Sequence, residues 1–227
     1  MKNMRFSTLV IAVILIAGFS FYGCEKENDN PNGLITFKVN TTSSNTVNLK
    51  STAAANDLVF NSGTITIREV VFDGDTDTLS VSRTIEQIAS IDYATGDVSP
   101  EIVIEVPAGE YSSVNLGVEL QDENSEPSVV IEGTYTNSSG VATPIRFEFN
   151  SGEVFEATAP AVNIEAGANL IGKITLDAAS WFSTVSSSDL DEATLTDGKI
   201  IVNSTSNPDI FDIVADKLDV DTQAIFE

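Results

Sequence analysis

The sequence predicts an all-β fold, an antiparallel β-sandwich with a short C-terminal helix. From Leu34 onward, apolar and polar residues alternate with a period of two, which is typical of half-buried strands. Turn-forming residues separate these alternating segments at short intervals, and helical periodicity is scarce. We expect about eight or nine strands, drawn from ten candidate segments.

We expect strands at 35–39, 65–72, 78–84, 101–106, 112–120, 128–136, 145–149, 154–157, 170–176 and 199–203. The alternation slips by one residue at Arg68-Glu69, which predicts a β-bulge there. The loop 137–140 predicts a hairpin, with Gly140 at a positive φ. Pro107-Ala108-Gly109 predicts a tight turn between two strands. Residues 40–56 read as a loop or a ragged edge strand.

One helix is expected near the C-terminus, with Asn207 as its N-cap and Pro208 in its first turn. Ile210, Ile213, Val214 and Leu218 then share one face. Shorter helical turns are expected around 177–182 and after Ser188.

Trp181 and Phe182 can be interpreted as buried core residues or as a platform for a sugar ring. We favour the core, because a lone tryptophan beside apolar neighbours is normally packed.

The N-terminal segment has the features of a secretory signal peptide at residues 1–23. Lys2 and Arg5 carry positive charge, and the following residues up to Gly23 are uncharged and mostly apolar. An uncleaved membrane anchor is the alternative, although the segment is only about long enough to cross a bilayer.

Phe21-Tyr22-Gly23-Cys24 resembles the lipobox of bacterial lipoproteins, in which the cysteine is acylated and becomes the first residue. Gly23 and Cys24 fit that pattern, whereas Phe21 and Tyr22 are bulkier than usual. The resemblance implies a covalent lipid on Cys24, an anchor in the outer membrane, and a cell-surface or periplasm-facing location. The alternative is a free buried thiol, which we do not favour because the chain has no second cysteine for a disulfide.

Residues 24–33 are polar and rich in turn formers, and we interpret them as a flexible tether before a single domain at 34–227. Cys24-Glu25-Lys26-Glu27 is similar to the signal that directs lipoproteins to the surface of Bacteroidetes-type bacteria. An ordinary solvated linker explains the same residues equally well.

The composition excludes several classes of function. A formal net charge of −23 repels phosphate, so nucleic acid is not an expected partner, and a membrane is approached only through the lipid. The absence of histidine excludes Ser-His-Asp and Cys-His nucleophiles and most zinc sites. Calcium or magnesium bound by oxygen ligands, or a carboxylate pair, remains compatible with the sequence.

Asp73, Asp75 and Asp77 alternate like the opening of a calcium-binding loop. Thr78 and Thr84 stand where such a loop needs glycine and glutamate, so we favour a simple hairpin turn over calcium. Asp77-Thr78-Leu79 also resembles an O-glycosylation sequence of Bacteroidetes-type exported proteins, which would modify Thr78.

A second acidic segment, 186–198, fits helix capping by Ser188 and Asp191 without any ligand. No spacing among the acidic residues selects a catalytic pair, so we do not expect an enzyme, although a glycosidase-like pair of carboxylates stays open.

Three segments, VPAGEYSSVNLGVEL at 106–120, VVIEGTYTNSSGVATPIRFEF at 129–149 and NPDIFDIVADKL at 207–218, resemble small Bacteroidetes-type exported lipoproteins. Those proteins have immunoglobulin-like or transthyretin-like sandwiches and no known function, so the resemblance implies no catalytic residue. It implies a non-catalytic envelope module that binds a glycan or protein ligand or has a structural role. The alternatives are a pilus-like, fimbrillin-type assembly subunit and a calcium-stabilised carbohydrate-binding module.

Overall fold

The computed structural model describes residues 31–43, 45–47, 49, 57–219 and 223–227. Its strands are β1 (Asn32–Thr41), β2 (Thr46–Val47), β3 (Asp57–Asp75), β4 (Ser80–Asp92), β5 (Val98–Ser99), β6 (Val103–Pro107), β7 (Gly109–Tyr111), β8 (Ser113–Leu120), β9 (Val129–Thr136), β10 (Ala142–Phe149), β11 (Val154–Ala159), β12 (Val162–Ile164), β13 (Asn169–Leu176), β14 (Leu195–Thr196), β15 (Lys199–Val202) and β16 (Ile225–Phe226). Its helices are α1 (Ala178–Trp181), α2 (Ser187–Asp191) and α3 (Pro208–Ala215).

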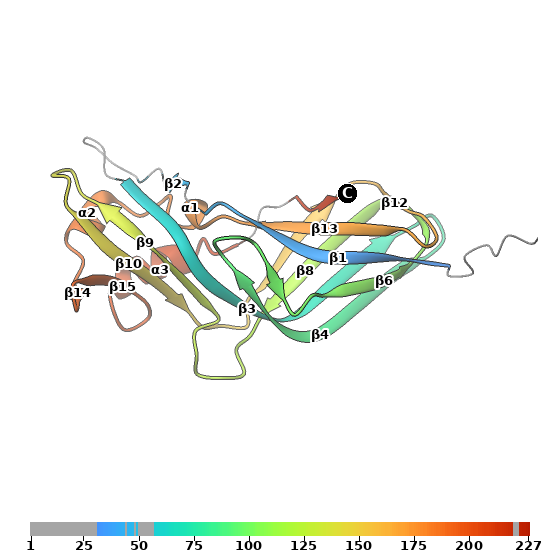
Figure 1. Cartoon of the computed structure of the whole chain (residues 1–227), viewed down its shortest axis with the longest axis horizontal. Coiled ribbons are helices and arrows are strands. Elements are labelled where there is room, and N and C mark those ends of the chain that lie inside the picture. The colour runs from blue at the N-terminus through green and yellow to red at the C-terminus, as the bar shows by residue number, and fades with distance from the viewer. Residues whose placement is uncertain (1–30, 44, 48, 50–56, 220–222) are drawn as a thin grey trace, which may run out of the picture.

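The long strand β3 runs through both halves of the elongated molecule (Figure 1). Its first part pairs with β2 and β9, and its second part pairs with β4 and β8. The sheet continues from β8 to β11 in one half, and from β9 through β10 and β15 to β14 in the other. One strand therefore holds the two halves in a fixed relation.

A second sheet, in the order β16-β13-β1-β6, packs on the half that contains β8 and β11 and completes the sandwich (Figure 1). Phe72 of β3 contacts Phe226 of β16, with ring centroids 6.4 Å apart. A Cβ on Gly172 of β13 would lie 3.5 Å from Leu116 of β8. The inward residues of both sheets thus form one apolar core, and burial is the main source of stability.

Helical segments cover the inner face of the other half of the sheet. Phe182, which follows α1, packs on Phe60 and Phe147 at centroid distances of 4.8 and 5.6 Å. Phe211 of α3 packs on Phe147 at 6.2 Å. Trp181 and Phe182 have no exposed surface, which confirms that both belong to the core.

The all-β sandwich is confirmed, with differences in detail. In the described part of the chain, the strands of five or more residues number nine, and the remaining strands are short. Strand β1 begins at Asn32, two residues before the expected start at Leu34. Two pairs, β1 with β13 and β10 with β15, are parallel rather than antiparallel. Parallel neighbours need a long connection, and both pairs are far apart in the sequence.

The expected β-bulge is present, because the pairing of β3 with β4 and β8 shifts between Ile67 and Glu69. A second shift, between Phe60 and Ser62 opposite β9, was not predicted. The β9–β10 hairpin is confirmed, with Gly140 at φ 79°.

The expected tight turn at 107–109 is wrong. Strand β6 ends at Pro107 and pairs with β1, whereas β7 begins at Gly109 and pairs with β12. The chain therefore passes from one sheet to another without reversing, and the Tyr111 hydroxyl donates a hydrogen bond to the Pro107 carbonyl at 2.8 Å.

Helix α3 is confirmed, with Pro208 in its first turn and with Ile210 and Val214 buried. Asn207 occupies the N-cap position, but its side chain does not cap the helix. It instead donates to the Ile201 and Thr194 carbonyls at 2.7 and 3.0 Å. Asn207 therefore fastens the start of α3 to the end of the sheet.

Candidate functional site

The hairpin between β3 and β4 contains the four residues expected to bind a metal or carry a glycan. Asp73 and Asp75 belong to β3, whereas Asp77 and Thr78 lie in the connecting turn. Thr76 organises this turn, because its hydroxyl accepts a hydrogen bond from the Leu79 amide at 3.0 Å. Asp75 also accepts a hydrogen bond from Ser80 across the turn, whereas the Asp73 and Asp77 side chains form none with a described residue.

Gly74 lies in β3 and faces the core, so it is not a turn residue. A Cβ at this position would lie 2.6 Å from the Tyr111 ring. Glycine is present because the aromatic ring fills the space where a side chain would be.

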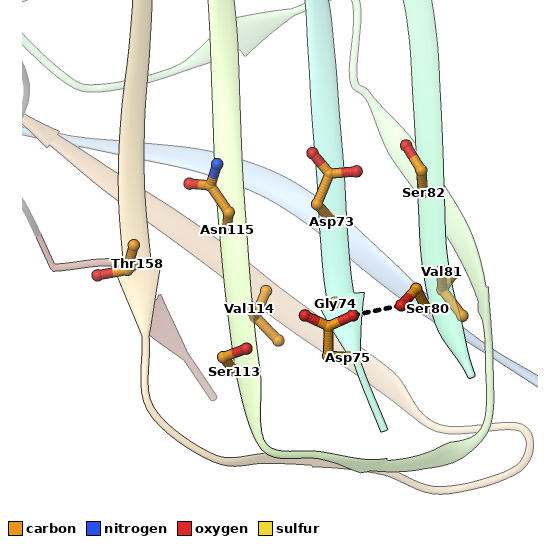
Figure 2. A pocket seen from close by; sticks show the side chains of 10 residues that line it. All are labelled: Asp73, Gly74, Asp75, Ser80, Val81, Ser82, Ser113, Val114, Asn115 and Thr158. Atoms are coloured by element: carbon orange, nitrogen blue, oxygen red, sulfur yellow. Dashed lines mark hydrogen bonds between the residues drawn. The ribbon is translucent and has the colours of Figure 1, made fainter. Parts of the chain in front are cut away.

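The outer face of the sheet carries short polar side chains in register. Ser82, Asp73, Asn115 and Thr158 form one row across β4, β3, β8 and β11, and Ser80, Asp75 and Ser113 form the next row (Figure 2). These rows line a shallow trough of about 380 Å³. Every lining residue belongs to a strand, so the trough has a rigid floor.

The trough contains two carboxylates, those of Asp73 and Asp75. The Asp73 side chain forms no hydrogen bond or ion pair with another described residue, and no lysine or arginine lines the trough. The buried Asn115 Oδ1 has no hydrogen-bond partner. Asp75 accepts a hydrogen bond from the Ser80 hydroxyl at 2.6 Å. Hydroxyl or ammonium donors of a ligand could pair with the Asp73 carboxylate, and the serine and threonine hydroxyls of the trough can both donate and accept.

The structure brings Asp73 and Asp75 together but leaves Asp77 in the turn. In the described part of the chain, no three Asp, Glu, His or Cys side chains are grouped as metal ligands would be. The calcium site at Asp73, Asp75 and Asp77 and the glycan on Thr78 stay predictions. Sequence reasoning missed Ser82, Asn115 and Thr158, because only strand pairing reveals that they are neighbours of Asp73.

The acidic segment around α2 caps the helix, as expected, but the capping residues differ from the predicted ones. The capping box is formed by Ser186 and Asp189, not by Ser188 and Asp191. Asp191 instead accepts a hydrogen bond from the Tyr135 hydroxyl at 2.7 Å.

A charged network crosses the outer face of the other half of the sheet. Glu132 accepts hydrogen bonds from Lys199 and Arg146, both at 3.2 Å, and Arg146 also donates to Glu148 at 2.6 Å. The Lys199 hydrogen bond, assisted by Arg146, lowers the pKa of Glu132 despite its partial burial. Burial alone would raise the pKa of Glu148, but the hydrogen bonds from Asn203 and Arg146 outweigh it and lower this pKa.

Cys24, the expected lipidation site, lies outside the described residues. Among the residues that are described, no helix has the length and apolar character needed to span a bilayer.

Comparisons of the chain with protein families, with curated proteins and with solved structures found no match.

Proposed function

We propose that the protein is an exported, lipid-anchored module of a bacterial cell envelope that binds a glycan or protein ligand without catalysis. The observation that carries this proposal is the position of Cys24. It follows an uncharged, mostly apolar segment, and the first strand of the fold begins at Asn32. The residues between them span at most about 25 Å when extended. An acylated Cys24 would hold the domain close to a membrane surface.

The orientation of the fold is compatible with such an anchor. Strand β1 begins at one end of the long axis, the right-hand end in Figure 1. The β9–β10 hairpin and α2 lie at the opposite end. A domain tethered before Asn32 would point this opposite end away from the membrane.

The electrostatics of the Glu132 and Glu148 pair argue against a glycosidase-like role for these two residues. Glycoside hydrolysis needs one carboxylic acid with a raised pKa, which donates a proton to the leaving group. Glu132 and Glu148, which share Arg146, both have lowered pKa values. Both therefore stay ionised near neutral pH, and this pair lacks the required acid.

The polar trough supports a binding role. It is open to solvent on a rigid sheet, and the Asp73 carboxylate lies on its outer face (Figure 2). A neutral glycan offers hydroxyl donors and a basic protein segment offers ammonium donors, so both remain candidate ligands.

Cell fractionation with the Cys24→Ser variant tests the anchor. In a diderm bacterial host, we expect the wild-type protein in the membrane fraction, with acyl chains on its N-terminal peptide by mass spectrometry. Cys24→Ser should accumulate as an unprocessed precursor or in a soluble fraction. The control Ser20→Ala keeps Gly23 and Cys24 and should behave like the wild type. A mature protein that starts at Met1, or a free Cys24 thiol, would refute the anchor.

A pilus-like subunit is the second candidate, favoured by the C-terminal strand. Strand β16 is a short edge strand that pairs only with β13 within the described residues. Exchange of such a strand between copies would produce oligomers. A strictly monomeric protein in size-exclusion chromatography, over a wide range of concentrations, would argue against assembly.

A further inference from the structure

A groove separate from the trough lies where β10 and β15 end. It is bordered by Ser125 and Pro127 on one side and by the turn at 203–205 on the other. Its volume is about 460 Å³, within the range of roughly 300–1,000 Å³ found for small-molecule sites. Its lining combines aromatic and polar side chains, unlike that of the trough.

The aromatic side of the groove is formed by Phe211 of α3. This half-buried ring is stacked on Phe147 and Phe149, with centroid distances of 6.2 and 6.0 Å and an angle of 29° in each case. Because two other rings support it from the core side, Phe211 is held in one orientation. It thus offers the groove a fixed apolar surface.

The polar side of the groove is formed by Glu148 and Asn203. Arg146 Nε donates to Glu148 Oε1 at 2.6 Å, and Asn203 Nδ2 donates to Glu148 Oε2 at 2.8 Å. Asn203 is itself fixed, because its Oδ1 accepts from the Ser206 amide at 2.7 Å. The carboxylate is therefore oriented in advance, and each of its oxygens keeps a lone pair for a further donor.

We infer that this groove is a subsite for a neutral glycan. One pyranose unit can place its apolar C–H face on Phe211, on the inner side of the sheet. The hydroxyl groups of a neighbouring unit, passing around the end of β10, can donate to Glu148 on the outer side. The ionised Glu148 and the net charge of −23 disfavour anionic sugars. The inference rests on the proposed binding function, to which it assigns a ligand class and a place on the fold.

The inference is tested by isothermal titration calorimetry on the full-length protein in detergent. The probes are the neutral hexasaccharides maltohexaose, laminarihexaose and mannohexaose, with hexagalacturonate as an anionic control and hexalysine as a basic peptide. We expect binding of at least one neutral hexasaccharide and no binding of hexagalacturonate. Phe211→Ala and Glu148→Gln should each weaken this binding about tenfold.

Two further variants separate recognition from folding. Phe211→Tyr keeps the ring and should retain binding even if Phe211→Ala disturbs the fold. Glu156→Gln removes an exposed carboxylate on β11, outside the groove, and should leave affinity unchanged.

The inference is overturned if no neutral hexasaccharide binds, if hexagalacturonate or hexalysine binds instead, or if Glu148→Gln leaves the affinity unaltered. The membrane anchor is judged separately. A membrane-bound protein that binds no hexasaccharide refutes only the glycan subsite, and a soluble protein that binds one refutes only the anchor.

Discussion

Asp73 on β3 and Asn115 on β8 are paired directly opposite each other, and both side chains lie on the outer face of the sheet (Figure 2). The Asp73 side chain has no hydrogen-bond partner within the described residues, and the buried Asn115 Oδ1 has none either. An unsatisfied buried acceptor such as Asn115 Oδ1 reduces stability. The half-buried Asp73 carboxylate lies in the open trough, where a donor from a ligand could pair with it.

The first prediction concerns the stability cost of Asn115. An unpaired buried acceptor costs about 1–3 kcal/mol, and valine favours strands. We therefore expect Asn115→Val to leave the free energy of unfolding unchanged or to raise it by about 1 kcal/mol. Urea denaturation followed by circular dichroism measures this change. Asn163→Val, at an exposed position on β12, controls for strand propensity alone.

A clear loss of stability in Asn115→Val, absent in Asn163→Val, would contradict this interpretation. It would mean that the Asn115 amide forms a stabilising hydrogen bond in solution.

The sequence predicted those features whose pattern lies within a few neighbouring residues, and it missed those that depend on which strands pair. The bulge at Ile67–Glu69 was predictable, because a slip in alternation is visible within a few residues. That Asp73 and Asn115 are neighbours was not predictable, because they lie on two strands and no short sequence pattern shows that these strands pair. The parallel pairing of β1 with β13 was missed for the same reason.

Helix α3 was predicted correctly in its position and buried face, but not in its cap. Pro208 and the spacing of Ile210 and Val214 correctly predicted where the helix begins and which face it buries. Asn207 was expected to cap the helix, but contacts with Thr194 and Ile201 compete for its side chain. Local capping preferences could not anticipate these tertiary contacts.

The second prediction concerns calcium. Asp75 already accepts a hydrogen bond from Ser80, and Asp77 lies in the turn away from the trough. We therefore expect the same thermal midpoint in EDTA and in millimolar calcium, measured by differential scanning calorimetry. A midpoint that rises with calcium in the wild type, but not in Asp73→Asn, would instead establish a calcium site.

The third prediction uses Trp181, the single tryptophan of the chain. Its ring is fully buried, and its Nε1 donates to the Asp219 carbonyl at 2.6 Å. We expect blue-shifted fluorescence that resists acrylamide quenching until the protein unfolds. Trp181→Phe should lower the free energy of unfolding by about 2–3 kcal/mol, because it loses packing and this hydrogen bond. Free access of acrylamide to the native protein would contradict the buried position.

The fourth prediction concerns acid stability. The folded-state pKa of Glu148 lies below its ordinary value of about 4.5, so its charge stabilises the fold above that pH. This stabilisation is lost as the pH falls through the folded-state pKa. Glu148→Gln should therefore be less stable than the wild type by about 1 kcal/mol at pH 6, and the difference should shrink near pH 3. Urea denaturation at the two pH values measures both differences.

Glu156→Gln is the control for this comparison, because the Glu156 side chain is exposed and has no hydrogen bond or ion pair with a described residue. It should show little difference from the wild type at pH 6. If the deficit of Glu148→Gln were equal at both pH values, it would have a steric origin rather than an electrostatic one.

The fifth prediction compares two glycines in neighbouring parts of the same sheet. A Cβ on Gly133 of β9 would lie 2.0 Å from the Val59 carbonyl oxygen and 2.9 Å from the Phe60 Cα. Backbone atoms of a central strand cannot move aside, so Gly133→Ala should force β9 away from β3 and cost about 3 kcal/mol. A Cβ on Gly117 of β8 would meet its nearest atoms at 3.7 Å, an ordinary contact.

Gly117→Ala should therefore be tolerated, and it should stabilise the fold by about 0.5 kcal/mol, because alanine has less conformational freedom in the unfolded chain. Thermal midpoints should fall in Gly133→Ala and rise in Gly117→Ala. Resistance to limited proteolysis gives a second measurement if Gly133→Ala folds too poorly for calorimetry. Equal stabilities of the two variants would mean that β9 does not lie as close to β3 as the structure places it. The register shift between Phe60 and Ser62 lies directly beside this close approach, because Phe60 is the residue that pairs with Gly133.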